Sequence, residues 1–312
     1  NFKNTVLVVS HDRHFLNKVC THMADVDFGD IKLYPGNYDF WKDASELAVK
    51  QRQDKNKKNE SKIKELEAFV RRFSANASKS KQATSRKNQI EKLRPEELPV
   101  SKRRSPYINF KTSQRCGTAI LKVKDLSVLQ EDGSPLFSNL SFTIEKDDKL
   151  AILADNDLIK TALLQVLSGE AAPDSGTITW GETISHAYFP KDNSDFFKTS
   201  KSLTEWLGQY EDTGDLETLR GYLGRMLFSG EDADKDVTVL SGGEKARAMF
   251  SRMMLTDANM LLFDEPTDHL DLESITALNT ALLDFNESLI FSTHDVALLS
   301  SAANRFLYIS DD

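Results

Sequence analysis

The chain has 312 residues, of which 39% are hydrophobic, and a formal net charge of −8. It shows no apolar run near the roughly 18 residues of a membrane-spanning helix and no secretory signal pattern. Its two cysteines, Cys20 and Cys116, lack metal-ligand spacing and predict free thiols in a reducing compartment. We therefore expect a cytoplasmic protein without a membrane partner. The chain opens in an apolar strand pattern without a Met, which predicts a fragment.

Residues 1–45 contain a segment that recurs near the other end of the chain. Val6–Asp12 (VLVVSHD) parallels Leu289–Asp295 (LIFSTHD), and each continues into a helical stretch and a further apolar strand. A repeat of this kind predicts two copies of one domain. Residues 1–45 would be the C-terminal part of the first copy, and residues 116–312 the second.

Residues 46–115 predict a basic helical hairpin that links the two domains. Apolar side chains at Ile63, Leu66, Val70 and Phe73 follow the spacing of a helix-pair seam. The small polar run 74–80 interrupts the first helix, and Pro95 would end the second.

The hairpin differs from the rest of the chain in charge. Residues 50–104 contain 18 Lys or Arg and 7 Asp or Glu, a net charge of +11, and the remainder carries −19. Such a segment predicts a polyanion partner, although basic helix surfaces are often merely solvated. The residues expected to bind RNA gather at the predicted tip: Arg71, Arg72, Lys79, Lys81, Arg86 and Lys87.

The second domain predicts a mixed α/β fold carrying a helical subdomain. Strands are expected at Ala119–Val128, Leu140–Ile144 and Lys149–Leu153, and helices at Thr161–Leu167, 202–229 and 244–255.

Two motifs in this domain predict phosphate chemistry. Ser241, Gly242, Gly243 and Glu244 open a helix, where a hydroxyl and backbone N–H groups suit an anionic phosphate. The apolar run Met260–Glu265 ends in two carboxylates, the pattern of a Mg²⁺ ligand, Asp264, followed by a water-activating acid, Glu265. Glu265 read alone could also be a solvated acid at a strand end.

The order of these motifs resembles the ATPase domain of the ABC superfamily, a P-loop NTPase fold. The resemblance implies ATP and Mg²⁺ as cofactors, with Asp264 holding Mg²⁺ and Glu265 acting as the general base. It implies that His294, and His11 in the first domain, contact the γ-phosphate, although an ordinary loop histidine is the alternative at each position. The four residues of the helix-opening motif would bind the ATP of a partner domain.

The resemblance also assigns a D-loop and a phosphate loop. Asp268 and Asp271 belong to the D-loop, where the family usually has Asn at the first position. Lys160 and Thr161 stand where a phosphate-binding Lys and a Mg²⁺-binding hydroxyl belong. The three glycines expected before them are replaced by Ala154, Asp157 and Ile159.

The loss of these glycines predicts weak or absent ATP binding to this domain's own pocket. Left-handed backbone costs a residue other than glycine roughly 1–2 kcal/mol. Asp155 and Asp157 would face a triphosphate, and like charges 4 Å apart repel by roughly 4 kcal/mol at an effective dielectric of 20. Residues 128–132 lack an aromatic to stack on adenine, and Pro190–Lys191 replaces an expected glutamine. The competing view is that Lys160, Thr161 and Asp264 still hold Mg-ATP.

Two ATPase domains joined by a hairpin, without a membrane span, resemble the ABC-F family of ribosome-associated ATPases. The runs FVRRFSANASKSKQATSR (69–86) and DEPTDHLDLES (264–274) are most similar to YbiT-type bacterial members. The resemblance implies ATP hydrolysis coupled to ribosome and tRNA binding, with the hairpin reaching tRNA and ribosomal RNA. The missing first ATPase domain would be an intramolecular partner, and this chain alone would have little ATPase activity.

Two other functions stay open. One is a non-catalytic scaffold, in which a degenerate ATPase domain docks on RNA or on the ribosome without turnover. The other is the ATPase subunit of a membrane transporter. The hairpin disfavours the transporter, because such ATPases do not need a basic hairpin between tandem domains.

Overall fold

The computed structural model describes residues 4–27, 29–73, 80–93, 103–211 and 215–310. The chain divides into two compact units, Asn1–Arg103 and Arg104–Asp312. None of the described helices is both long and apolar enough to cross a membrane.

The first unit begins with a short helix, α1 (Arg13–Val19), and an antiparallel pair, β1 (His22–Asp27) and β2 (Asp30–Pro35). Asp12 caps α1 by accepting a hydrogen bond from Phe15 N, just as Asp295 caps α9 (Val296–Ala302) through Leu298 N. The predicted strand at Val6–Val9 is not a strand in the structure, and Leu7 is 89% exposed. The counterpart β9 (Ser288–Ser292) lies between two parallel strands, whereas residues 6–9 have no neighbouring strand to pair with among the described residues.

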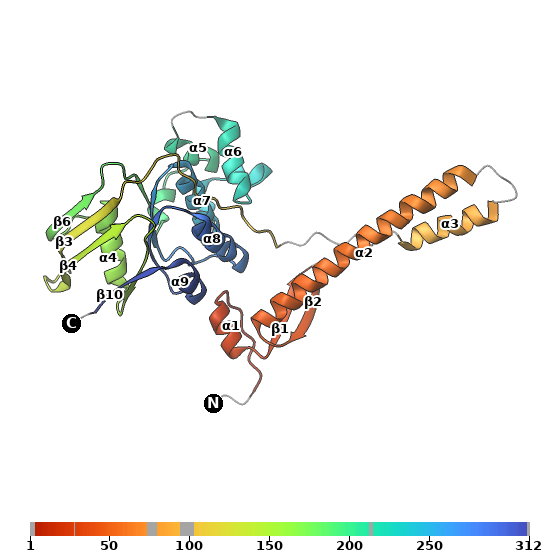
Figure 1. Ribbon diagram of the computed structural model, residues 1–312, viewed down its shortest axis with the longest axis horizontal. Helices are drawn as coiled ribbons and strands as arrows, with labels where there is room; N and C mark the ends of the chain where they lie inside the picture. Colours follow the sequence, from red (N-terminus) through yellow and green to blue (C-terminus); the bar gives the residue numbers. More distant parts are fainter. Residues whose placement is uncertain (1–3, 28, 74–79, 94–102, 212–214, 311–312) are drawn as a thin grey trace. The chain divides into compact units, whose positions relative to one another are not determined.

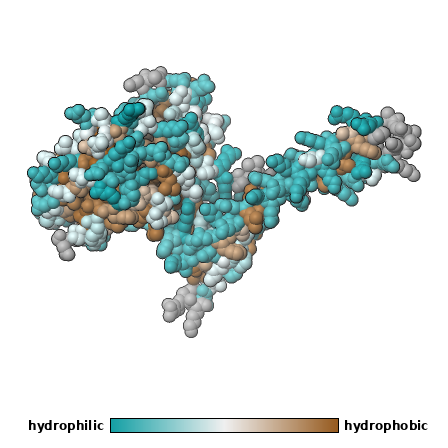
Figure 2. Space-filling view, viewed as in Figure 1, coloured by the Kyte–Doolittle hydropathy of each residue, from teal (hydrophilic) through white to brown (hydrophobic). Residues whose placement is uncertain are grey.

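The two-helix hairpin is confirmed. It consists of α2 (Tyr38–Phe73) and α3 (Ser80–Leu93), with Leu66 buried and Arg86 lying 5.4 Å from the ring centre of Phe69. The first helix starts at Tyr38, eight residues before the predicted start of the hairpin at residue 46, because Asn37 caps it by accepting a hydrogen bond from Phe40 N. Most of the visible hairpin surface is hydrophilic (Figure 2).

The second unit contains two sheets. The antiparallel sheet has the order β4-β3-β6, with β3 at Ala119–Leu129, β4 at Pro135–Glu145 and β6 at Ser175–Trp180. The parallel sheet has the order β10-β5-β9-β8-β7, formed by β5 (Lys149–Ala154), β7 (His186–Phe189), β8 (Met260–Asp264), β9 and β10 (Arg305–Ile309). Every residue of β8 and β9 is buried, as expected for parallel strands covered on both faces.

Helices cover these sheets and complete the mixed α/β fold that the sequence predicts. One core joins Ile120 of β3 and Leu262 of β8 through Leu163 of α4 (Asp157–Ser168) (Figure 1). The second core includes α7 (Gly242–Leu255) and α8 (Leu272–Asp284).

The helical subdomain is less continuous than predicted over 202–229. It contains α5 (Leu203–Leu207), a 3₁₀ turn at Gly208–Tyr210, and α6 (Leu216–Arg225). These helices lie away from β3, β4 and β6, beyond α7 (Figure 1). Separate N-caps at Ser202 and Asp215 account for two short helices in place of one.

Candidate functional site at the carboxyl ends of the parallel strands

The candidate site forms where β8 and β9 end beside the start of α4. Asp264 and Ser292 are paired across these strands, so Glu265 and His294 follow at the same edge of the sheet. Lys160, on the first turn of α4, is buried and reaches this edge. The structure therefore brings together Lys160, Asp264, Glu265 and His294, as the sequence motifs predict.

Asp264 has the surroundings of a metal ligand. It is fully buried, Ser292 Oγ donates to its Oδ1 at 2.7 Å, and its Oδ2 has no hydrogen-bond partner among the described residues. Burial raises the pKa of Asp264, while Ser292 and Thr161 act in the opposite direction. A carboxylate oxygen beside a threonine hydroxyl is a donor set that suits Mg²⁺. The metal side of the site fits the ion that the motif implies.

Glu265 is held on both of its carboxylate oxygens. Its Oε1 accepts from Lys160 Nζ at 2.8 Å, and its Oε2 accepts from the backbone N–H of His294 at 2.9 Å. The side chain is buried, and the backbone adopts the left-handed region with φ 44. A general base needs a carboxylate oxygen within reach of a water. In this geometry the carboxylate of Glu265 is instead bonded to Lys160 and to the backbone of His294.

Asp157 accepts from three side chains, one on its own helix α4 and two in the loops that follow β7 and β9. Lys160 Nζ lies 2.8 Å from Oδ1, and Lys191 Nζ and His294 Nε2 lie 3.1 and 3.2 Å from Oδ2. We call these five residues the Asp157 cluster: Asp157, Lys160, Lys191, Glu265 and His294. Three of its members, Asp157, Glu265 and His294, have atoms close enough to share a metal ion. Lys160 Nζ lies 2.8 Å from both carboxylates, so an ammonium already supplies the positive charge there.

The cluster shifts the proton affinities of its members. The pKa of Asp157 is held well below its usual range, chiefly by the hydrogen bond from Lys160, with His294 and Lys191 adding to the effect. Burial alone would lower the pKa of Lys160, but the hydrogen bonds to Asp157 and Glu265 raise it. For Lys191 as well, burial works against the charge and the bond to Asp157 raises the pKa. All three groups are therefore charged at neutral pH.

We expect Asp157→Asn to destabilise the chain in a pH-dependent way. Because folding lowers the pKa of Asp157, its contribution is complete above the unfolded-state value of about 4 and is lost as the pH falls below it. The side chain is 42% exposed, which limits the contribution to about 1 kcal/mol or less. Urea unfolding of both proteins between pH 7 and pH 3 measures the difference, which should shrink below pH 4. A constant difference across this range would contradict the assignment.

The loop before α4 does not have the phosphate-binding shape. Asn156 caps α4 by accepting from Leu158 N at 2.9 Å, so one N–H at the helix start is already bonded. None of residues 154–159, all of them described, has a positive φ. The conformational cost expected from the lost glycines is therefore not incurred, because the loop adopts an ordinary capped helix start. The residues of this loop do not fit a triphosphate.

Asp155 does not lie where the sequence led us to expect. Its carboxylate accepts from Tyr308 Oη of β10 at 2.8 Å and makes no ion pair with the Asp157 cluster. Asp155 and Asp157 were both expected to face a triphosphate, but only Asp157 contacts Lys160.

The helix-opening motif, Ser241–Glu244, forms the N-terminus of α7. Ser241 caps this helix in a reciprocal box, since its backbone N donates to Glu244 Oε2 at 2.8 Å and Glu244 N donates to Ser241 Oγ at 3.4 Å. A Cβ on Gly243 would lie 3.0 Å from the carbonyl oxygen of His269, so the glycine permits close approach of the next loop. Ser241 and Gly242 are exposed, and none of these residues belongs to the Asp157 cluster.

The two D-loop acids have separate positions. The backbone N of exposed Asp268 donates to the carbonyl oxygen of Glu265 at 3.1 Å. Asp271 is the N-cap of α8 and accepts from Ser274 N at 2.8 Å. Asp268 therefore lies three residues after the candidate base and is hydrogen-bonded to its backbone, whereas Asp271 has a helix-capping contact.

The remaining predicted residues lie in the first unit. His11 is exposed there and precedes the capping residue of α1. Arg71, Arg72, Arg86 and Lys87 are exposed on the hairpin. Lys81 lies on α3, but its side chain is outside the described atoms, and Lys79 lies outside the described residues.

Sequence reasoning missed Asn156 and Lys191 as site residues. An Asn directly before a helix is an N-cap signal that could have identified the first. Lys191 appeared only as a departure from the expected glutamine, and its contact with Asp157 depends on how β7 pairs with β8.

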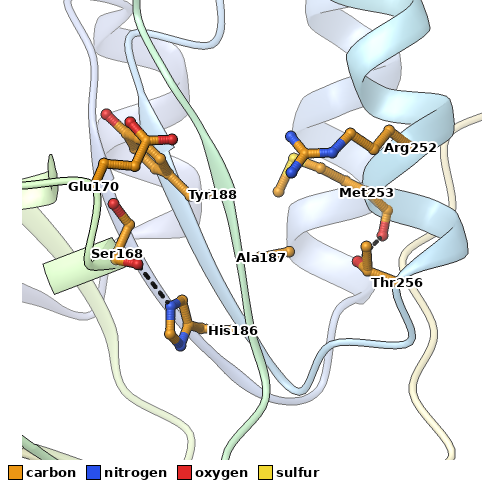
Figure 3. Close-up of a pocket in the computed structure, with 8 residues that line it drawn as sticks. All are labelled: Ser168, Glu170, His186, Ala187, Tyr188, Arg252, Met253 and Thr256. Atoms are coloured by element: carbon orange, nitrogen blue, oxygen red, sulfur yellow. Dashed lines mark hydrogen bonds between the residues drawn. The ribbon is translucent and has the colours of Figure 1, made fainter. Parts of the chain in front are cut away.

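A second pocket, of about 180 Å³, lies between β7, the end of α4 and α7 (Figure 3). The guanidinium of Arg252 points into it and lies 4.6 and 4.8 Å from the ring centres of Phe196 and Tyr210. Burial raises the pKa of Tyr188, which lines the same pocket. None of the predicted site residues lines this pocket.

Two family models described as ABC transporter match residues 24–110 and 137–268. The chain is 53% identical over 312 residues to an uncharacterized ABC transporter ATP-binding protein, YkpA, of Bacillus subtilis. It is 45% identical over 310 residues to the probable ATP-binding protein YbiT of Escherichia coli O157:H7. Each alignment covers 99% of this chain, which spans 58% of the length of each relative. The yeast ABC transporter ATP-binding protein ARB1 is 30% identical, with 99% of this chain and 52% of that protein covered.

Solved structures show the same fold. A putative metal-chelate type ABC transporter is 24% identical, with a TM-score of 0.51 over 61% of this chain and 80% of that chain. An ATP-binding cassette in a post-hydrolysis state, bound to ADP and phosphate, is 16% identical, with a TM-score of 0.53 over 61% of this chain and 94% of that chain. Both likenesses are to the fold of an ABC ATPase domain.

Proposed function

Because this chain belongs to the ABC family of ATP-binding proteins, with close homologues of the ABC-F type, we propose that it supplies the linker and second ATPase domain of an ABC-F protein. Such a protein would couple ATP hydrolysis to ribosome and tRNA binding during translation in the cytoplasm. The observation that carries the proposal is a basic hairpin that directly precedes an ABC ATPase fold.

ABC ATPase domains bind ATP, generally with Mg²⁺, and the family hydrolyses ATP. We propose that the loop at Ser241 binds the nucleotide of a partner ATPase domain, where His11 would contact the γ-phosphate. The pocket at Lys160 is degenerate, because its loop lacks the backbone shape for phosphates and Glu265 is tied to Lys160. Asp264 and Thr161 could still hold Mg²⁺, but this chain alone is expected to hydrolyse ATP slowly or not at all.

Titration with ATP tests the degenerate pocket. The 312-residue chain is compared with a variant carrying Gly at positions 154, 157 and 159. We expect weak or undetectable binding by the first and a clear gain in the second. Equal micromolar affinity in both would overturn the proposal of degeneracy.

Ribosome binding tests the function as a whole. The full-length protein is expected to cosediment with ribosomes in the presence of ATP. Failure to be retained under any nucleotide condition would count against it. Retention without any ATP turnover would favour the scaffold alternative, which the tied carboxylate of Glu265 makes the second candidate.

Removal of charge from the hairpin tip should weaken ribosome binding. We expect Arg71→Gln, Arg72→Gln, Arg86→Gln and Lys87→Gln together to lower retention about tenfold or more, because each lost phosphate contact reduces the salt-dependent affinity. The matched control removes the same charge lower on α2, through Lys57→Gln, Lys58→Gln, Lys62→Gln and Lys64→Gln, all of which are exposed. Equal losses from both sets would show a non-specific charge effect and contradict the tip assignment.

A further inference from the structure

Three donors converge on one carboxylate in the candidate site. Lys160 comes from α4, Lys191 follows β7 and His294 follows β9, and all three lie within 3.2 Å of an oxygen of Asp157. Cationic and N–H donors that meet at one point from separate elements are the arrangement with which proteins hold phosphate. Here the acceptor belongs to the chain, at a position where the phosphate-loop pattern has glycine.

We infer that Asp157 is an intramolecular ligand of the phosphate-binding groups, and that its carboxylate keeps polyphosphates out of this pocket. The inference rests on the proposed degeneracy of the pocket and gives it a cause. The barrier is an anion already in place, and the missing glycines contribute less.

The charge balance of the Asp157 cluster supports this inference. Two carboxylates, Asp157 and Glu265, face two ammonium groups, Lys160 and Lys191, so the cluster carries no net charge when His294 is neutral. A polyphosphate would add negative charge without a free cation to receive it. It would have to displace Asp157 from Lys160, whose side chain is 5% exposed and has little room to form new contacts. Neutralising Asp157 would remove one of the negative charges that face Lys160 and Lys191 and so favour the binding of an anion.

The backbone at the start of α4 also helps to hold Asp157 against the phosphate-binding groups. Asn156 holds the first turn of α4 closed by accepting from Leu158 N, and this places Asp157 with its carboxylate toward Lys160. Residue 157 therefore lies on the helix, and its side chain takes the contact that a bound phosphate would make.

The test compares two single substitutions, each of which removes one negative charge near the start of α4. Asp157→Asn removes the ligand, whereas Asp155→Asn is the matched control, because Asp155 accepts from Tyr308 and has no ion pair with the cluster. Calorimetric titration of the 312-residue chain uses inorganic tripolyphosphate and, separately, ATP. We expect Asp157→Asn to bind both about tenfold more tightly than the unsubstituted chain, and Asp155→Asn to change affinity by about threefold or less.

The outcomes separate this inference from the proposed function. If Asp157→Asn binds no more tightly than Asp155→Asn while the variant with three glycines gains affinity, the inference is wrong and the degeneracy stands. If the unsubstituted chain already binds ATP as tightly as the three-glycine variant, the degeneracy itself is wrong. Thermal unfolding verifies that each variant is folded. Asp157→Gly provides a second route, since it removes the carboxylate and restores glycine; no gain in affinity from it would also overturn the inference.

Discussion

Replacing Lys160 by Met is expected to lower the free energy of unfolding by about 3–5 kcal/mol. Lys160 and Glu265 form a salt bridge at 2.8 Å in which the side chains are 5% and 0% exposed. Removing the ammonium leaves the buried carboxylate of Glu265 without its cation, and only His294 Nε2, 3.4 Å away, remains near that oxygen. The effect should be large because water cannot reach Glu265 to compensate for the lost charge.

The control for Lys160→Met is the double variant Lys160→Met, Glu265→Gln. It removes both charges, so the desolvation penalty of an isolated carboxylate disappears and most of the lost stability should return. Urea unfolding of the chain, of the single variants Lys160→Met and Glu265→Gln, and of the double variant, followed by circular dichroism, measures the coupling. A double variant as unstable as Lys160→Met would show that packing of the lysine stem, and not the ion pair, stabilises the site.

In the full-length protein, Ser241→Asp is expected to reduce ATP hydrolysis by about a hundredfold. The loop that it alters would bind the nucleotide of the partner domain, and a carboxylate there repels the γ-phosphate. Asp is itself a favourable N-cap, so α7 should keep its capping bond and the fold its stability. In the same assay Glu265→Gln is expected to change turnover by about twofold or less, because the pocket that it belongs to is proposed to be degenerate.

Ser202→Asp is the matched control for Ser241→Asp. Ser202 caps α5 in the same reciprocal box with Glu205, but it lies outside the proposed nucleotide sites. Initial rates of phosphate release are compared for the three variants. Loss of activity in Glu265→Gln with retention in Ser241→Asp would reverse the assignment of the two half-sites.

The sequence predicts the elements whose pattern is local. The apolar run before Asp264 is a fully buried strand, and the helix seam around Leu66 belongs to the hairpin. Val6–Val9 carries the same kind of pattern as β9 but forms no strand, because a parallel strand exists only with partners on its edges. Local pattern therefore gives the capacity to form a strand, and pairing decides whether it forms.

The candidate site could be predicted only in part. Motif order indicated Lys160, Asp264, Glu265 and His294, and the structure brings these four together. The role of Asp157 could not be derived from the sequence, because glycine loss predicts only strain and repulsion. Its contacts with Lys191 and His294 join residues 34 and 137 positions apart and depend on the fold.

The covalent attachment of Asp157 sets how it competes with dissolved anions. A side chain on the same helix as Lys160 has an effective concentration fixed by the chain, independent of dilution and of the metabolic state of the cell. Nucleotide levels that rise and fall with growth would then change the occupancy of a partner site while leaving this one unaltered. Of the two pockets, the occupancy of the partner site would follow the nucleotide concentration, and the occupancy of the pocket at Lys160 would not change with it.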